Sequence, residues 1–173
     1  MRFSFLPALS LVLGTLLLPV SSQAGSPPAK AATATQPGIY KMAIDRSVSL
    51  TDAAESMRLR ANALNLKLVA ELPLSKQVEA VTGKPQPTVT IFQFCDAVTA
   101  KELIDMSMDF VIYMPCRISL VEDDKGQGWL VMQDIDVDLV AKEKKLQKEL
   151  TTRIKKVRDG LIEIMKAGAH GEL

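Results

Sequence analysis

The 173-residue sequence is poor in the side chains that most enzymes use for catalysis, with one histidine and two cysteines. The histidine, His170, stands in a glycine-containing C-terminal segment that we expect to be disordered, and no Ser-His or Cys-His pair is evident. A G-x-S-x-G elbow, a glycine-rich phosphate loop and a Cys-x-x-Cys pair are also missing. These absences disfavour hydrolase chemistry and covalent haem attachment, and no catalytic residue is predicted.

Net charge is lacking as well. The chain has 21 basic and 20 acidic residues, and removal of an N-terminal leader that contains Arg2 and no acid would leave 20 of each. A neutral protein has no electrostatic reason to bind a polyanion. We therefore expect no nucleic-acid partner.

Long apolar runs are confined to the N-terminus. Arg2 precedes an apolar run from Phe3 to Val20, and small residues follow it up to Ala24. This arrangement is typical of a secretory signal peptide over residues 1–24, cleaved after Ala24. Prolines and a glycine interrupt the run, which favours cleavage over the alternative, a membrane anchor. No later run reaches the ~20 residues that span a bilayer, so we expect an exported protein, most simply periplasmic, with no membrane span after signal cleavage.

The remainder divides by composition into a linker and one domain. Residues 25–38 are rich in alanine, proline and threonine without periodicity, which predicts a flexible linker. Residues 39–173 alternate between strand and helix patterns and predict a single two-layer α+β domain, with a mainly antiparallel sheet of about five strands and helices on one face. The expected strands are 39–44, 66–72, 89–95, 116–122 and 129–132, and the expected helices are 49–64, 99–106 and 139–167. Thr51, Thr99 with Glu102, and Gly168 are the expected helix caps.

The clearest local signal is a β-hairpin. In residues 116–122, Ile118 and Leu120 alternate with polar side chains. The segment 123–128 contains two glycines that can take the positive φ of a tight turn. Trp129 then opens an apolar partner strand.

The C-terminal helix is long for so small a sheet. One apolar stripe runs along it from Leu139 to Met165, and lysines and glutamates occupy its other faces. It either lies across its own sheet or overhangs and pairs with a second copy. The second alternative is one reason to expect a homodimer.

Several of these features together resemble the domain of unknown function 302 family. They are the strand Phe92 to Cys95, a short helix, the segment Met114-Pro-Cys-Arg-Ile, and the acidic glycine turn before Trp129. The resemblance covers about residues 49–138 and is closest to a cysteine-containing, exported branch. It implies a small two-layer α+β domain that is often dimeric. It implies no reaction and no catalytic residues.

The two cysteines are the main candidate site. Cys95 ends one expected strand and Cys116 starts another after a helical crossover. If these strands are neighbours, the two Cα atoms could lie within the ~7 Å that a disulfide requires. An oxidising compartment would favour that bond, and a loop of about 20 residues would gain ~3 kcal/mol from it. We therefore expect a structural disulfide.

Functional thiols are the alternative. The same cysteines could act as a redox dithiol, as a sulfur carrier, or with Met114 as a Cu(I) site, because thiolate and thioether suit soft metals. Arg117 would favour a Cys116 thiolate if it turned toward the sulfur. Neighbouring strand residues point to opposite faces, however, so an exposed Arg117 is the simpler interpretation. Methionines are also common core filler, and two buried free thiols remain a further alternative.

Three alternating carboxylates form a weaker candidate. Asp134, Asp136 and Asp138 would share one face if the preceding strand continued through them. They could then bind a hard cation such as Ca²⁺. The alternative is a charged, solvent-facing strand edge that discourages aggregation.

Two functions follow from these candidates. The first is an exported, non-enzymatic binding or accessory protein with structural cysteines and no cofactor. The second is a thiol-dependent protein that handles electrons, sulfur, copper or haem through Cys95 and Cys116.

Overall fold

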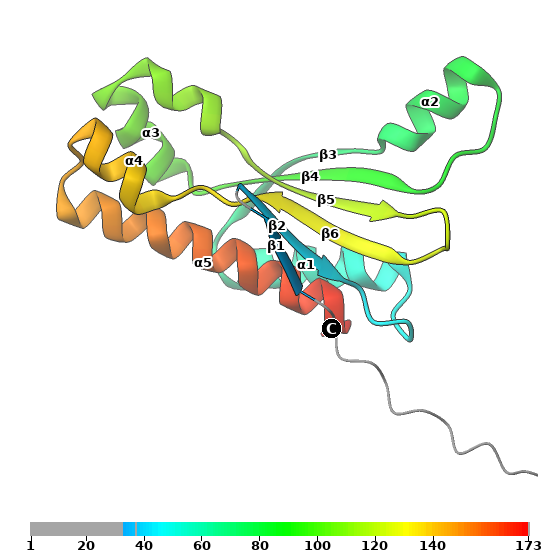
Figure 1. Ribbon diagram of the computed structural model, residues 1–173. Helices are drawn as coiled ribbons and strands as arrows, with labels where there is room; N and C mark the ends of the chain where they lie inside the picture. The colour runs from blue at the N-terminus through cyan, green and yellow to red at the C-terminus, as the bar shows by residue number, and fades with distance from the viewer. Residues whose placement is uncertain (1–32, 37, 173) are drawn as a thin grey trace, which may run out of the picture.

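The computed structural model describes residues 33–36 and 38–172 and contains one six-stranded sheet with helices packed against it (Figure 1). The strand order is β1-β2-β6-β5-β4-β3, and every neighbouring pair is antiparallel. The predicted α+β fold is confirmed. The strands are β1 (Thr33–Gln36), β2 (Ile39–Ala43), β3 (Lys67–Leu72), β4 (Val89–Cys95), β5 (Cys116–Glu122) and β6 (Gly128–Gln133). The helices are α1 (Leu50–Ala63), α2 (Leu74–Thr82), α3 (Ala97–Met106), the 3₁₀ helix η1 (Met108–Tyr113), α4 (Val137–Lys144) and α5 (Lys148–His170).

The N-terminal predictions fall largely outside this description. The expected signal peptide, residues 1–24, and residues 25–32 of the expected linker lie beyond the described residues. Within the expected linker, Thr33–Gln36 instead form β1, which pairs with β2 from Thr33↔Met42 to Gln36↔Ile39. The sheet therefore has one strand more than the sequence predicts.

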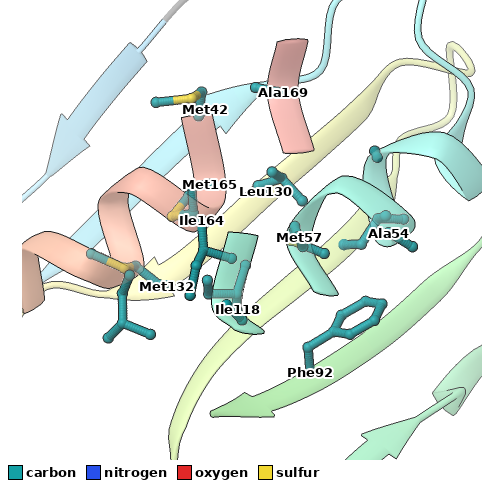
Figure 2. Packing of buried hydrophobic residues seen from close by; sticks show 14 of the residues in the cluster. Met42, Ala54, Met57, Phe92, Ile118, Leu130, Met132, Ile164, Met165 and Ala169 are labelled. Carbon is teal, nitrogen blue, oxygen red and sulfur yellow. The ribbon is translucent and has the colours of Figure 1, made fainter. Parts of the chain in front are cut away.

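The main core lies between the sheet and two helices. Alternate residues of the central strands, such as Phe92, Ile118 and Leu130, point to one face and are buried there. α1 and α5 cover this face, and their Met57 and Ile164 meet the strand residues in the cluster (Figure 2). The prediction of helices on one face is thus confirmed, and the C-terminal half of α5 lies on its own sheet.

Small residues let α1 and α5 approach each other and the sheet closely. A methyl group added at Gly168 would lie 2.6 Å from Met57 Cγ and 3.1 Å from the carbonyl oxygen of Ala53. Gly168 is therefore a packing residue, not the predicted helix cap. α5 continues to His170 and ends at Gly171, whose φ of +66° is the left-handed conformation that glycine adopts easily.

The predicted continuous C-terminal helix is interrupted. α4 ends where Lys145 adopts a left-handed conformation with φ of 53°, and α5 begins after Gln147. No glycine or proline marks this break, so the helical pattern concealed it. Leu139, the first residue of the predicted apolar stripe, is exposed rather than buried.

Two predicted N-caps were displaced by better-placed acceptors. In α1 the Ser49 hydroxyl, not Thr51, accepts a hydrogen bond from the Asp52 amide at 3.0 Å. In α3 Asp96 accepts from the amides of Val98 and Thr99, at 3.1 Å and 3.0 Å. Each cap lies two or three residues before the predicted one, and α3 starts at Ala97, two residues earlier than expected.

A second, smaller apolar cluster lies at the N-terminal end of α5. Leu103 of α3, Phe110 of η1 and Leu150 of α5 are buried together there. α4 and the loop before α5 complete it through Val140 and Leu146. Among the described helices, none is long and apolar enough to cross a membrane.

Candidate functional site

Strands β5 and β6 diverge at one end of the sheet. Their pairing runs from Glu122↔Gly128 to Ile118↔Met132 and stops there. Beyond it, β5 continues along β4 to Phe94↔Cys116, while β6 continues along β2 to Ile39↔Gln133. We call the opening between residues 116–117 and residues 133–135 the fork.

A cavity of about 410 Å³ occupies the fork. Its size lies within the range of small-molecule sites. Its walls come from strand ends on one side and from α4 and α5 on the other, and they are mainly apolar. Apolar lining residues include Val131, Ile135, Val137, Ile154, Val157 and Leu161, and polar ones are Cys116, Arg117, Ser119, Gln133 and Arg158.

Both cysteines are held as neutral thiols by their surroundings. Cys116 packs against the main core, and its burial raises the pKa of its thiol to about 11, with the nearby Cys95 adding to the rise. Burial also raises the pKa of Cys95, and the adjacent Asp96 adds to it. A thiol must lose its proton to act as a nucleophile, so both side chains are weak nucleophiles at neutral pH.

The cysteines lie on neighbouring strands, which was the condition for the expected disulfide, but they face different ways. Cys116 is opposite Phe94, whereas Cys95 is opposite Lys67 on β3. Neighbouring positions on a strand point to opposite faces, so Cys116 shares the buried face of Phe94 and Cys95 points to the other. Both cysteines are free in the structure, with their side chains on different faces of the sheet, so the structure does not show the expected disulfide.

Arg117 and Met114, the candidate thiolate-stabilising cation and metal ligand for the cysteines, do not act on them in the structure. Arg117 is exposed and opposite Gln93, and it does not lower the pKa of Cys116. Met114 packs against the second cluster and lines a separate cavity of about 50 Å³ beside Phe110. Within residues 33–36 and 38–172, no group of three or more His, Cys, Asp or Glu side chains is arranged to hold a metal.

The three alternating aspartates serve three separate roles. Asp134 binds Arg158 through Oδ1 and Nε at 2.8 Å, Asp136 caps α4 by accepting from the Leu139 amide at 2.9 Å, and Asp138 pairs with Lys155 at 2.6 Å. The strand does not continue through them, because β6 ends at Gln133, so they form neither a shared cation-binding face nor a strand edge.

His170 was also misjudged. It is the last residue of α5, and its Nδ1 lies 2.8 Å from Asp45 Oδ2. The backbone supports this contact, since the Asp45 amide donates to the Ala169 carbonyl at 2.9 Å. The C-terminal end of α5 is thereby attached to the loop that follows β2.

The sequence did not reveal the α5 side of the cavity. Val157 and Arg158 belong to a helix that looked like a simple cover for the sheet. The available signal was that the two strand patterns stop at different places, at Pro115 before β5 and at Asp134 after β6.

Comparisons with known proteins agree with the family resemblance. The sequence profile of a family described as domain of unknown function DUF302 matches residues 40–168, which extends beyond the predicted 49–138 and includes α4 and most of α5. The fold is similar to the crystal structure of the uncharacterized conserved protein DUF302 from Bacillus stearothermophilus. The TM-score is 0.61, the identity is 11%, and the match covers 75% of this chain and 96% of that chain. No curated protein matches the chain.

Proposed function

The chain belongs to the DUF302 family, whose description names no activity, and we propose from its own geometry that it is an exported, non-enzymatic binding or accessory protein. The fork between β5 and β6 is the site at which it holds a small ligand with an apolar body.

The cavity in the fork is the observation that supports this function. A volume of about 410 Å³ with mainly apolar walls and a few polar groups is the usual composition of a small-molecule site. The walls come from β5, β6, α4 and α5, so the ligand would contact four elements at once. Rigid secondary structure on every side favours a preformed site.

Thiol chemistry is the second candidate, because Cys116 lines this cavity. A ligand that is itself soft, such as Cu(I) or a sulfur species, could bind its sulfur. Against a catalytic role, burial raises the thiol pKa to about 11, and His170 is engaged by Asp45. The binding function therefore has the stronger support.

Export is supported by the N-terminal sequence, with its basic start, apolar run and small residues before Ala24. The expected location is the periplasm. There the Cys95–Cys116 disulfide stays a prediction, and its formation requires the Cys95 side chain to turn around the end of β4. Intact mass of the exported protein, with and without alkylation, decides this point. A loss of two hydrogens indicates the disulfide, and added mass from metal, haem or sulfur indicates the thiol-dependent function.

Ligand binding is tested with the neutral fluorophore N-phenyl-1-naphthylamine. We expect saturable binding at one site, weakened at least tenfold in Val157→Phe, because the larger ring fills the cavity. Val81→Phe is the matched control, since Val81 lies on α2 and is 87% exposed. Circular dichroism checks that both variants are folded. Equal binding by the wild type and a folded Val157→Phe variant would exclude the fork as the site.

A homodimer is proposed on a separate observation, the apolar surface of η1. Met108 and Ile112 are 78% and 74% exposed, whereas Phe110 of the same helix is buried. Exposed apolar groups gathered on one short element are typical of a protein contact. α5 itself is engaged by the sheet and the second cluster, so we assign the contact to η1 and not to the stripe of α5.

The oligomeric state is measured by light scattering during size exclusion. We expect a dimer for the wild type and for Val81→Lys, and a monomer for Ile112→Lys, because a lysine in the contact would be desolvated without a partner. A monomeric wild type at high concentration contradicts the homodimer.

A further inference from the structure

The charged groups that line the cavity in the fork have one sign. Arg117 and Arg158 line it, and no aspartate or glutamate among residues 33–36 and 38–172 does. The charge of Arg158 is already neutralised, because Asp134 Oδ1 lies 2.8 Å from its Nε and Asp159 Oδ1 lies 3.4 Å from its Nη1. The net charge at the cavity wall is therefore supplied by Arg117.

Arg117 makes no ion pair with any residue in 33–36 or 38–172. Its cross-strand partner is the neutral Gln93, and Ser119 follows it on the same face. Gln133, on the other arm of the fork, is neutral too. The exposure of Arg117 places it at the mouth of the cavity, where its guanidinium keeps a planar set of donors available for an incoming anion.

On the basis of the proposed binding function, we infer that the ligand of the fork is an organic anion with an apolar body, such as a medium-chain carboxylate. Its anionic group pairs with Arg117, and its body lies against the apolar wall that includes Ile135, Val157 and Leu161. A carboxylate suits the guanidinium because it can accept two parallel N–H bonds.

Each part of such a ligand contributes in a separable way. Burial of one methylene against the apolar wall raises affinity about fourfold. The charged hydrogen bonds to Arg117 add about a further tenfold over a neutral alcohol of equal length. A quaternary amine of the same length binds more weakly because Arg117 repels it, and no carboxylate of the described part of the chain lines the cavity to receive it.

The test compares octanoate, octanol and octyltrimethylammonium as competitors of N-phenyl-1-naphthylamine on the folded protein. In the wild type, octanoate should compete about tenfold better than octanol, and octyltrimethylammonium should compete least. Arg117→Gln should remove the advantage of octanoate and leave octanol unchanged. Arg46→Gln is the matched control, because Arg46 is also exposed and lies by a different cavity.

The outcomes separate the two proposals. Equal competition by octanoate and octanol in the wild type overturns the anion inference and leaves the apolar site standing. The same loss in Arg46→Gln as in Arg117→Gln also overturns it, because the effect would then reflect overall charge. Failure of the fluorophore and all three competitors to bind overturns the proposed function itself.

Discussion

The two halves of α5 belong to regions of very different packing. In the C-terminal half, Gly160 to Ala169 include most of the buried residues of the helix, and they lie against α1 and the sheet. In the N-terminal half, Leu150 is buried in the second cluster, while Ile154 lines both the cavity of the fork and a smaller one. The same helix is thus close-packed at one end and bordered by empty space at the other.

The difference follows from side-chain size. Glycine and alanine in the C-terminal half let α5 approach α1 and the sheet closely, as at Gly168. The N-terminal half carries β-branched and charged residues in their place, and Ile154, Val157 and Arg158 line the cavity of the fork. The close-packed region provides stability, and the region with cavities is the one in which a ligand could bind.

The largest expected effect comes from truncation in the close-packed region. Phe92→Ala removes a ring that is 1% exposed, and should lower the free energy of unfolding by about 3–5 kcal/mol. Leu150→Ala in the second cluster should cost about 2 kcal/mol, the low end for a buried leucine. Urea unfolding at equilibrium measures both. A larger loss for Leu150→Ala would contradict the comparison.

The next effect is a pH dependence of stability caused by Cys116, which lies between the main core and the cavity of the fork. The pKa of Cys116 rises from 9.0 to about 11 on folding, so between these values the folded state holds a proton that the unfolded state has released. Stability is therefore complete below pH 9 and falls as pH rises, by about 2–3 kcal/mol by pH 11. Unfolding free energies at pH 8, 9, 10 and 11 test this for the reduced protein. Cys116→Ala should lack most of the decline, and an equal decline in that variant would rule out Cys116 as its source.

The smallest effect compares two glycines of α5. Gly168→Ala should cost about 1–3 kcal/mol, because its methyl group would meet Met57 and the Ala53 carbonyl. Gly160→Ala should be neutral or slightly stabilising. There the nearest atom is the tip of the Leu66 side chain at 3.0 Å, and alanine gains about 1 kcal/mol over glycine in a helix. Thermal and urea unfolding compare the two, and an equal loss would show that the helix is packed as tightly at Gly160 as at Gly168.

The sequence predicted the features that local patterns determine. The β5–β6 hairpin was predicted from the alternation of Ile118 and Leu120 with polar residues before a glycine turn, and the pairing of the two strands confirms it. The adjacency of Cys95 and Cys116 was only a condition of the expected disulfide, and the pairing of β4 with β5 meets it. Their opposite faces were not anticipated, because a register offset of one residue depends on how β4 pairs with both β3 and β5.

Features set by long-range contacts were missed for the same reason. The fork arises because β5 follows β4 while β6 follows β2, and the different ends of the two strand patterns do not reveal these partners. The break at Lys145 has no glycine or proline to mark it. His170 looked like part of a free tail, because its partner Asp45 lies 125 residues away.

The pairing of α5 with α1 also sets the order in which the chain can fold. These helices make one of the most extensive contacts in the molecule, although about 100 residues separate them. A chain that leaves a ribosome or a translocation channel N-terminus first has an uncovered sheet face until its final helix emerges. The main core can therefore be completed only after α5 has emerged, whichever side of a membrane the chain has reached by then.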